Sequence, residues 1–205
     1  MLSENLKKID VKNSTIVAAT KYVTDKEIRH LYHLGIKNMG ENRVQSFLEK
    51  YEKLRDIDII WHFIGHLQTN KVKSVINKID YLHSLDSIRL AEKINLFSNK
   101  KIKCFIEINS GEETKCGIEY SEVVEFLEKI KKYPKIEIIG FMTMAPNTDD
   151  EETIKKTFKK LEELKNRINP NFKLSMGMSN DYKIAIECGA THIRLGSILW
   201  KGVLL

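Results

Sequence analysis

The chain has 205 residues, of which 34 are basic and 28 are acidic, so its formal net charge is +6. With three prolines and no Gly/Ser-rich tract, this length predicts one domain over residues 1–205 with a sizeable core. The start has no apolar run typical of a signal peptide, no window approaches the ~18 apolar residues of a membrane span, and the three cysteines form no CxxC pair. We therefore expect a cytoplasmic protein with reduced thiols and no membrane contact.

The basic excess by itself does not predict nucleic-acid binding. The lysines are spread over most of the predicted helices and are mixed with glutamates, whereas a nucleic-acid surface concentrates them on one element among aromatic residues. We expect a solvated Lys/Glu surface, whose positive potential favours anionic small molecules. A nucleic-acid or protein-interaction role stays open as a lesser alternative, for which strong salt-dependent binding to oligonucleotides would be the sign.

Along the chain, short β-branched runs alternate with segments whose apolar residues recur at helical spacing. After a shortened N-terminal helix, the predicted strands are residues 15–20, 35–39, 58–64, 79–83, 102–108, 136–144, 172–176 and 191–195. The predicted helices lie between them, at 24–34, 43–54, 69–78, 86–98, around 123–130, 151–168 and 180–188. Polar residues that commonly start helices precede several of them: Thr24 with Glu27, Ser87, Ser121 and Asp150.

Eight strands alternating with helices predict parallel strands joined by crossover helices. The fold class is therefore α/β, and eight such units favour a single closed (β/α)8 TIM barrel, although this one is compact for that fold. A doubly wound open sheet is the rival fold, but it suits five to seven strands better. No G-x-G-x-x-G follows a predicted strand, so a dinucleotide fingerprint is absent from the sequence.

Small and polar residues gather where the predicted strands end, which is the end of a barrel that carries active sites. They are Lys21, Gly40-Glu41-Asn42, Gly65-His66, Asn109, Met144-Ala145-Pro146, Gly177-Met178-Ser179 and Gly196-Ser197. The glycines fit a backbone that approaches a ligand, and they fit a tight strand-to-helix turn equally well.

Lys21 ends the apolar run 16–20, which offers its charge no local partner. A partly desolvated lysine at a barrel mouth can act as an amine nucleophile. With 28 lysines in the chain, its position alone does not distinguish it from an ordinary surface lysine.

The segments after the last two predicted strands, 175–180 and 194–197, supply serine hydroxyls, glycines and the guanidinium of Arg194. Barrels often bind phosphate with these two loops and with a helix N-terminus beside them. In a closed barrel the strand of Lys21 adjoins the last strand. A lysine that can hold a carbonyl, beside a site that can hold a phosphate, matches the chemistry of pyridoxal 5′-phosphate (PLP).

The sequence resembles the YggS/PROSC family of PLP homeostasis proteins, which are relatives of the alanine racemase N-terminal barrel. The resemblance covers nearly the whole chain. It is carried by VAATK at 17–21, GENRVQ at 40–45, WHFIGHLQTNK at 61–71, Asn109, KCG at 115–117, GFMTMAP at 140–146, LSMGMSND at 174–181 and IRLG at 193–196.

The resemblance implies that PLP is the cofactor and that Lys21 holds it as a Schiff base. It also implies phosphate binding by Ser179, Gly196 and Ser197, and an Arg194 that faces the pyridine nitrogen. Asn42 and Met178 would line the cofactor. Trp61, His62 and the loop 65–71 belong to the family signature without a derivable chemical role, and we expect His62 to pack inside the barrel with its ring hydrogen-bonded.

The implied function is storage, buffering or delivery of PLP, with PLP-dependent apoenzymes as partners. Arginine cannot accept a proton, so the pyridine nitrogen should stay neutral and the cofactor should be a weak electron sink. Alanine racemase draws a tyrosine from a second domain, and the sequence has no room for one after residue 205. We therefore expect a cofactor holder without robust catalysis.

Two enzymatic alternatives stay open. One is a PLP-dependent racemase or lyase of low activity, with His62, His66 or Tyr182 as a second acid/base. The other is a barrel enzyme that binds a different phosphorylated metabolite, with Lys21 bonded to the substrate.

The remaining expectations concern the ends and one thiol. The ending 198–205 is apolar where the family has Phe-Gly and a charged tail, so we expect the last helix to be missing and the last strand to be less covered. The compact chain favours a monomer. Cys116 is either a redox-sensitive thiol or, more commonly for a loop cysteine, an inert one.

Overall fold

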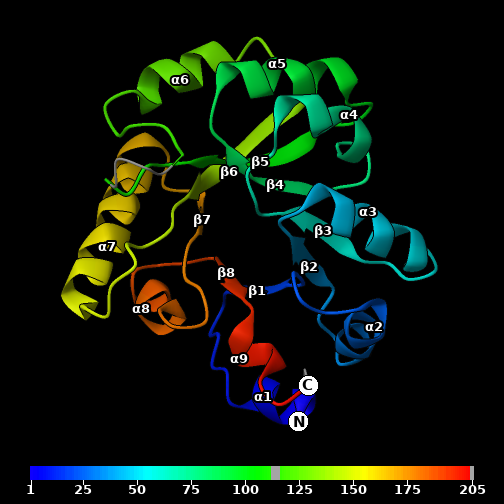
Figure 1. Ribbon diagram of the computed structural model, residues 1–205. Helices are drawn as coiled ribbons and strands as arrows, with labels where there is room; N and C mark the ends of the chain where they lie inside the picture. Colours follow the sequence, from blue (N-terminus) through cyan, green and yellow to red (C-terminus); the bar gives the residue numbers. More distant parts are fainter. Residues whose placement is uncertain (112–115, 204–205) are drawn as a thin grey trace.

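The computed structural model describes residues 1–111 and 116–203, and these form a closed barrel of parallel strands with helices around the outside (Figure 1). Each strand pairs with the strands before and after it in the chain, and β8 closes on β1 from Thr15–His192 to Ala18–Leu195. The strands are β1 (Thr15–Ala19), β2 (Asn38–Glu41), β3 (Ile60–Phe63), β4 (Tyr81–Leu85), β5 (Ile102–Glu107), β6 (Ile136–Met142), β7 (Lys173–Ser175) and β8 (His192–Leu195). The predicted (β/α)8 barrel is therefore confirmed. The open-sheet alternative is wrong, because the β1–β8 pairing leaves no edge strand.

The helices begin at the capping residues that the sequence indicated. Thr24 and Glu27 form a complete capping box, and the Ser87 and Asp150 side chains accept N–H bonds from their first turns. The helices are α1 (Leu2–Lys7), α2 (Asp25–His33), α3 (Val44–Lys53), the 3₁₀ helix η1 (Thr69–Lys71), α4 (Val72–Val75), α5 (Ile88–Phe97), α6 (Val123–Ile130), α7 (Glu151–Ile168), α8 (Tyr182–Glu187) and α9 (Ser197–Trp200). In the part of the chain that is described, none of them is long and apolar enough to cross a membrane.

Two strands lie later in the chain than predicted. Residues 35–37 were expected to open the second strand, but Gly35 has a φ of +94° and ends the turn after α2. The pairing with β3 begins at Asn38 and continues through Glu41. β4 is likewise shifted to Tyr81–Leu85, with a register irregularity against β5. In both cases the pairing partner decides the boundary, and apolar periodicity does not encode it.

Side chains of the strands alternate between two layers, one facing the helices and one inside the barrel. Trp61 and Phe63 of β3 pack edge-on against Phe47 of α3, which lies in the outer layer. His62 between them points inward, where its ring stacks on Tyr81 at 4.3 Å. His83, Phe105 and His192 also contact one another inside. The barrel interior is thus aromatic and polar, while the helix-facing layer is apolar.

Helices α1 and α9, near the two ends of the chain, lie side by side on the β8–β1 side of the barrel (Figure 1). Residues 197–200 form the one-turn helix α9, whose Leu199 and Trp200 are buried, and Asn5 of α1 donates to the carbonyls of Leu199 and Lys201 at 2.8 and 3.0 Å. A helix is therefore present where the sequence suggested that one would be missing, and it covers this side. Residues 204–205 and Lys115, which belonged to the sequence motifs, lie outside the described residues.

Candidate functional site

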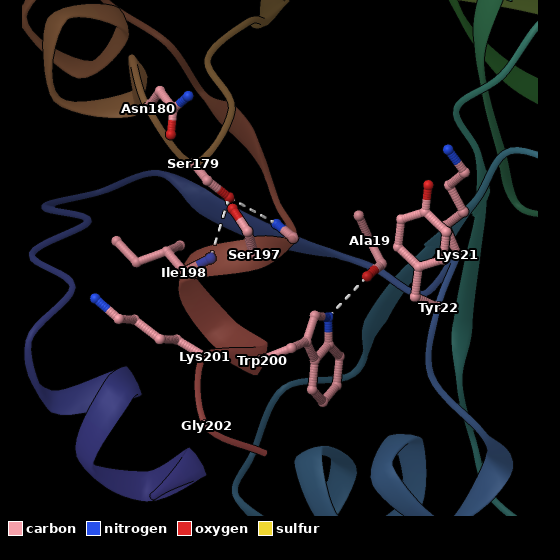
Figure 2. A pocket seen from close by; sticks show the side chains of 11 residues that line it. Ala19, Lys21, Tyr22, Ser179, Asn180, Ser197, Ile198, Trp200, Lys201 and Gly202 are labelled. Carbon is pink, nitrogen blue, oxygen red and sulfur yellow. Dashed lines mark hydrogen bonds between the residues drawn. The ribbon is translucent and has the colours of Figure 1, made fainter. Parts of the chain in front are cut away.

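Two adjoining cavities open where β7, β8 and β1 end, with volumes of about 730 and 480 Å³. They share Ala19, Ser179, Asn180, Gly196 and Ser197, so these five residues form the boundary between the two spaces. The larger cavity is also lined by Lys21, Tyr22, Ile198, Trp200, Lys201 and Gly202, and the smaller by the loop 144–149, Ile154, Met178, Asp181 and Arg194. Figure 2 shows Lys21 and the Ser179–Ser197 pair on opposite sides of Ala19.

The loops after β7 and β8 are joined through the Ser179 hydroxyl. Its oxygen accepts the N–H of Gly196 at 3.1 Å and the N–H of Ile198 at 3.3 Å (Figure 2). Because both N–H groups donate to this oxygen, the hydroxyl hydrogen of Ser179 stays available to an anion, beside Ser197 on the same boundary. A Cβ at Gly196 would lie 3.6 Å from Ala19 Cβ, so a side chain there would project toward the space that both cavities share. The residues present thus fit a phosphate group.

Lys21 follows β1 and is partly exposed, with its Nζ 4.5 Å from the centre of the Tyr22 ring. The hydrogen bond and the positive charge of Lys21 lower the pKa of Tyr22. The Trp200 indole donates to the carbonyl of Ala19 at 2.9 Å, so the last residue of β1 is tied to α9. Lys21 therefore extends from a strand end held on one side by the segment that follows β8.

A buried ion pair holds the other side of this strand end. The Lys50 ammonium, from α3, donates to Glu41 Oε2 and to the carbonyl of Thr20, both at 2.5 Å. Thr20 also donates through its N–H and its hydroxyl to the Gly40 carbonyl. Glu41 is fully buried and Lys50 nearly so. The residue before Lys21 is consequently fixed by β2 and α3.

Arg194 is buried at the end of β8, and its guanidinium is held by neutral acceptors. Nη1 donates to the carbonyl and the hydroxyl of Ser175 at 2.9 and 2.7 Å, and Nη2 donates to the Thr143 carbonyl at 3.0 Å. Burial lowers the pKa of Arg194 to about 10, against the opposing attraction of Asp181 and Glu107. The group therefore keeps its charge at neutral pH, and it can only donate hydrogen bonds.

A chain of hydrogen bonds runs from Arg194 into the barrel. Ser175 Oγ lies 2.8 Å from His83 Nδ1, His83 Nε2 lies 2.9 Å from His62 Nδ1, and His62 Nε2 lies 2.9 Å from Asn38 Oδ1. Burial lowers the pKa of His62 and of His83 well below the ordinary value, so both rings are neutral. The Asn38 oxygen can only accept, which sets the direction of the whole chain and leaves His83 Nδ1 as the acceptor of the Ser175 proton.

Each further donor in this chain is then determined. His83 donates from Nε2 to His62, and His62 donates from Nε2 to the Asn38 oxygen. The chain gives His62 the packed, hydrogen-bonded role expected for it, and it immobilises Arg194 from beneath the site. The sequence placed the Ser175 hydroxyl in the phosphate-binding segment 175–180, but the hydroxyl is buried and bonded to Arg194 and His83 instead. His83 was missed at the sequence level, because its link to Ser175 depends on β4 and β7 facing each other across the barrel.

The structure brings together six of the seven predicted cofactor residues. Ser179, Gly196 and Ser197 line both cavities, Lys21 lines the larger one, and Met178 and Arg194 line the smaller one. Asn42 lines neither. It follows β2, packs against Gly65, and its buried Oδ1 has no hydrogen-bond partner among the described residues.

Asp181 is a further site residue that the sequence reasoning did not single out. Its carboxylate accepts the N–H of Met178 at 2.5 Å, and its charge attracts Arg194 across the smaller cavity. Asp181 is the last residue of the motif at 174–181, so the motif could have pointed to it. The sequence alone did not indicate that its carboxylate would bond Met178 and face Arg194.

Neither cavity contains a residue from the set considered as a second acid/base. His62 is inside the barrel, Tyr182 is buried in α8, and His66 lies beyond β3. Tyr22, which the sequence reasoning did not name, does line the larger cavity beside Lys21.

Comparison with known proteins matches residues 4–203 to the family "Alanine racemase, N-terminal domain". The pyridoxal phosphate homeostasis protein of Aquifex aeolicus is 43% identical over 194 residues, which cover 90% of this chain and 85% of the relative. The protein of the same name from Homo sapiens is 35% identical over 211 residues, covering 90% and 75%.

Among solved structures, PipY of Synechococcus elongatus with PLP bound has a TM-score of 0.86 and 28% identity, over 97% of this chain and 99% of that one. An alanine racemase of Clostridium difficile, at a TM-score of 0.78 and 17% identity, shares the fold over 56% of its own length. On these similarities, the chain belongs to the family of pyridoxal phosphate homeostasis proteins, built on the alanine racemase N-terminal barrel.

Proposed function

We propose that this chain binds PLP at the β7–β8–β1 side of its barrel mouth and contributes to PLP homeostasis by storing, buffering or delivering the cofactor. The observation that carries the proposal is the pair of joined cavities, which have Lys21 at one side and the Ser179 hydroxyl with the Gly196 and Ile198 N–H groups at the other. The names of the relatives and the PLP-bound PipY structure support it.

Each proposed contact follows from the chemistry of this chain's residues. Lys21 supplies the primary amine that would condense with the aldehyde of PLP, the aldehyde oxygen leaving as water. Ser179, Gly196 and Ser197 surround the phosphate with hydroxyl and N–H donors. Met178 lines the cofactor on the β7 side, and Asn42, with its unpaired buried oxygen, is proposed to approach it from β2.

Arg194 is proposed to hold the pyridine nitrogen as a hydrogen-bond acceptor. The guanidinium stays protonated, so it cannot take up a proton from the ring, and a neutral ring nitrogen makes PLP a weak sink for electrons. Ser175, Thr143 and the histidine chain keep this donor in place. The arrangement favours a protein that holds the cofactor over an efficient carbanion enzyme.

The same proposal extends to the partners. A protein that holds PLP without consuming it can pass it to PLP-dependent apoenzymes, and we propose that it does so as a monomer. Mixing the PLP-loaded chain with an inactive apoenzyme should restore that enzyme's activity faster than the PLP released into buffer alone accounts for. If the apoenzyme regains activity only at the rate that free PLP gives, direct delivery is ruled out and storage is the remaining role.

The test of the binding site compares two lysines of the larger cavity. PLP added to the wild-type chain should produce the absorbance band of lysine-bound PLP, and borohydride reduction followed by peptide mass mapping should place the label on Lys21. Lys21→Ala should abolish the band. Lys201→Ala, which removes the other lysine that lines the cavity, should retain it. A label on Lys201, or an unchanged band in Lys21→Ala, would overturn the proposal.

A further inference from the structure

Three potential metal ligands meet on the side of the barrel mouth that faces β3, β4 and β5, away from β8. They are the imidazole of His66, the carboxylate of Asp86 and the thiol of Cys116, whose donor atoms all lie within 4.8 Å of one another. His66 Nδ1 and Asp86 Oδ2 are 3.1 Å apart. This is a hydrogen-bonding distance, and it is also close to the roughly 3.3 Å that separates two ligands of tetrahedral zinc with bonds of ~2.0–2.1 Å, so both groups can reach one ion.

Backbone contacts place His66 and Asp86 next to each other. The Ser84 hydroxyl of β4 donates to the Gly65 carbonyl at 2.6 Å, which draws the loop after β3 to the end of β4. A Cβ at Gly65 would lie 2.4 Å from the Asn42 carbonyl, so this loop also packs tightly against β2. Asp86 directly follows β4 and precedes Ser87, the N-cap of α5.

Cys116 is brought to the same place by the return of the loop after β5. Ile118 donates its N–H to the Glu107 carbonyl at 2.8 Å, and Asn109 donates to the Ile118 carbonyl at 3.0 Å. Gly117 has a φ of +126°, and a Cβ there would lie 2.7 Å from the Asn109 nitrogen. The two residues after Cys116 are thus anchored to the end of β5, and the thiol is exposed.

A buried carboxyl side chain belongs to the same side of the mouth. Glu107, the last residue of β5, is 6% exposed, and its backbone carbonyl accepts the N–H of Ile118, two residues after Cys116. An imidazole nitrogen, a carboxylate oxygen and a thiol sulfur from three different loops thus meet at one place, which is a donor set suited to a transition-type cation.

We propose that His66, Asp86 and Cys116 bind a divalent cation of the zinc type, separate from the proposed PLP site. A thiolate with an imidazole selects Zn²⁺ over Mg²⁺ and Ca²⁺, which prefer oxygen ligands alone. On binding, the Cys116 S–H bond breaks, its proton passes to solvent, and the sulfur forms the bond to the metal. Three protein ligands leave one position of a tetrahedral ion open.

The test uses the reactivity of Cys116, since Cys104 and Cys188 are buried. The chain is stripped with a chelator, desalted and alkylated with iodoacetamide, with and without Zn²⁺, and modification is followed by peptide mass mapping. Zn²⁺ should abolish alkylation of Cys116, whereas Mg²⁺ should leave it unchanged. Co²⁺ in place of Zn²⁺ should give a thiolate-to-metal charge-transfer band that is lost in Cys116→Ser.

The ligand variants separate a built site from metal held by the thiol alone. His66→Gln and Asp86→Asn should each weaken protection by Zn²⁺ at least about tenfold, the effect that loss of even an outer partner of a metal ligand has. In the control variant His33→Gln, which replaces an exposed histidine of α2, Zn²⁺ should protect Cys116 as fully as in the wild type. Unprotected wild-type Cys116, or equal protection in all three variants, would overturn the proposal. The assay contains no PLP, so its outcome does not depend on whether the proposed PLP-binding function is correct.

Discussion

The two sides of the barrel mouth have opposite chemistries although they are built by the same kind of strand end. The β7–β8–β1 side presents serine hydroxyls, backbone N–H groups, Lys21 and Arg194, which together suit an anion. The β3–β5 side presents His66, Asp86, Glu107 and Cys116, which suit a cation. The barrel positions both sets equally, so the residues that follow each strand decide what each side can bind.

The two sides also differ in how their strand ends are supported. Beneath Lys21 lies the buried ion pair of Glu41 and Lys50, whereas the loop that carries His66 is held by the neutral bond from Ser84 to Gly65. Beneath Arg194 lies the chain of buried neutral histidines. The β7–β8–β1 side therefore depends more on buried polar groups for its support. Substitutions of those groups should affect this side more than the β3–β5 side.

The largest effect is expected from Glu41→Ala. It leaves the Lys50 ammonium buried without its carboxylate, which should lower the free energy of unfolding by about 3–5 kcal/mol. Denaturant unfolding measures this, and the double variant with Lys50→Met should recover part of the loss. Asp56→Ala, which breaks the more exposed pair with Arg29, should cost much less, because solvent screens an ion pair at the surface. Equal losses in the two single variants would contradict the importance of the buried pair.

The next effect is a loss of stability in acid that originates inside the barrel. Burial, followed by the charges of Lys173 and Arg194, lowers the pKa of His192 to about 4 from 6.5. Between these values the unfolded chain binds a proton that the folded chain does not, so stability falls as pH falls from 6.5 to 4. His192 should account for roughly 2–3 kcal/mol of the loss in the free energy of unfolding over this pH range.

His192→Gln should reduce this acid dependence by that share, measured from denaturant midpoints between pH 7 and pH 4. Part of the dependence should remain, because burial also lowers the pKa values of His62 and His83. An unaltered slope in His192→Gln would place the acid sensitivity elsewhere.

The smallest effect is expected for a single hydroxyl. Ser179→Ala removes the group that joins the β7 and β8 loops and would contact the phosphate, so PLP affinity should fall by about 2 kcal/mol, or roughly thirtyfold. PLP titration followed by absorbance measures it. Ser84→Ala removes a buried hydroxyl on the β3–β5 side and should leave PLP affinity unchanged. Similar losses in both variants would mean that the two sides are not independent.

Much of the fold followed from local patterns. The alternation of β-branched runs with helical periodicity predicted all eight strands, and Thr24, Ser87 and Asp150 correctly marked helix starts. These signals are local, because periodicity and capping involve residues a few positions apart. The boundaries of β2 and β4 were displaced, since they depend on pairing with β3 and β5.

The sequence by itself determined the barrel and most of the lining of the β7–β8–β1 side, since Lys21, Ser179, Arg194 and Ser197 lie at or soon after the ends of predicted strands. Only the tertiary structure decided which distant groups meet. It decided that Arg194 is linked through Ser175 and His83 to His62. It also decided that His66, Asp86 and Cys116 form a cluster and that Asn42 lies outside both cavities. The physical reason is that barrel closure and loop return bring together residues tens of positions apart, and no local pattern records those distances.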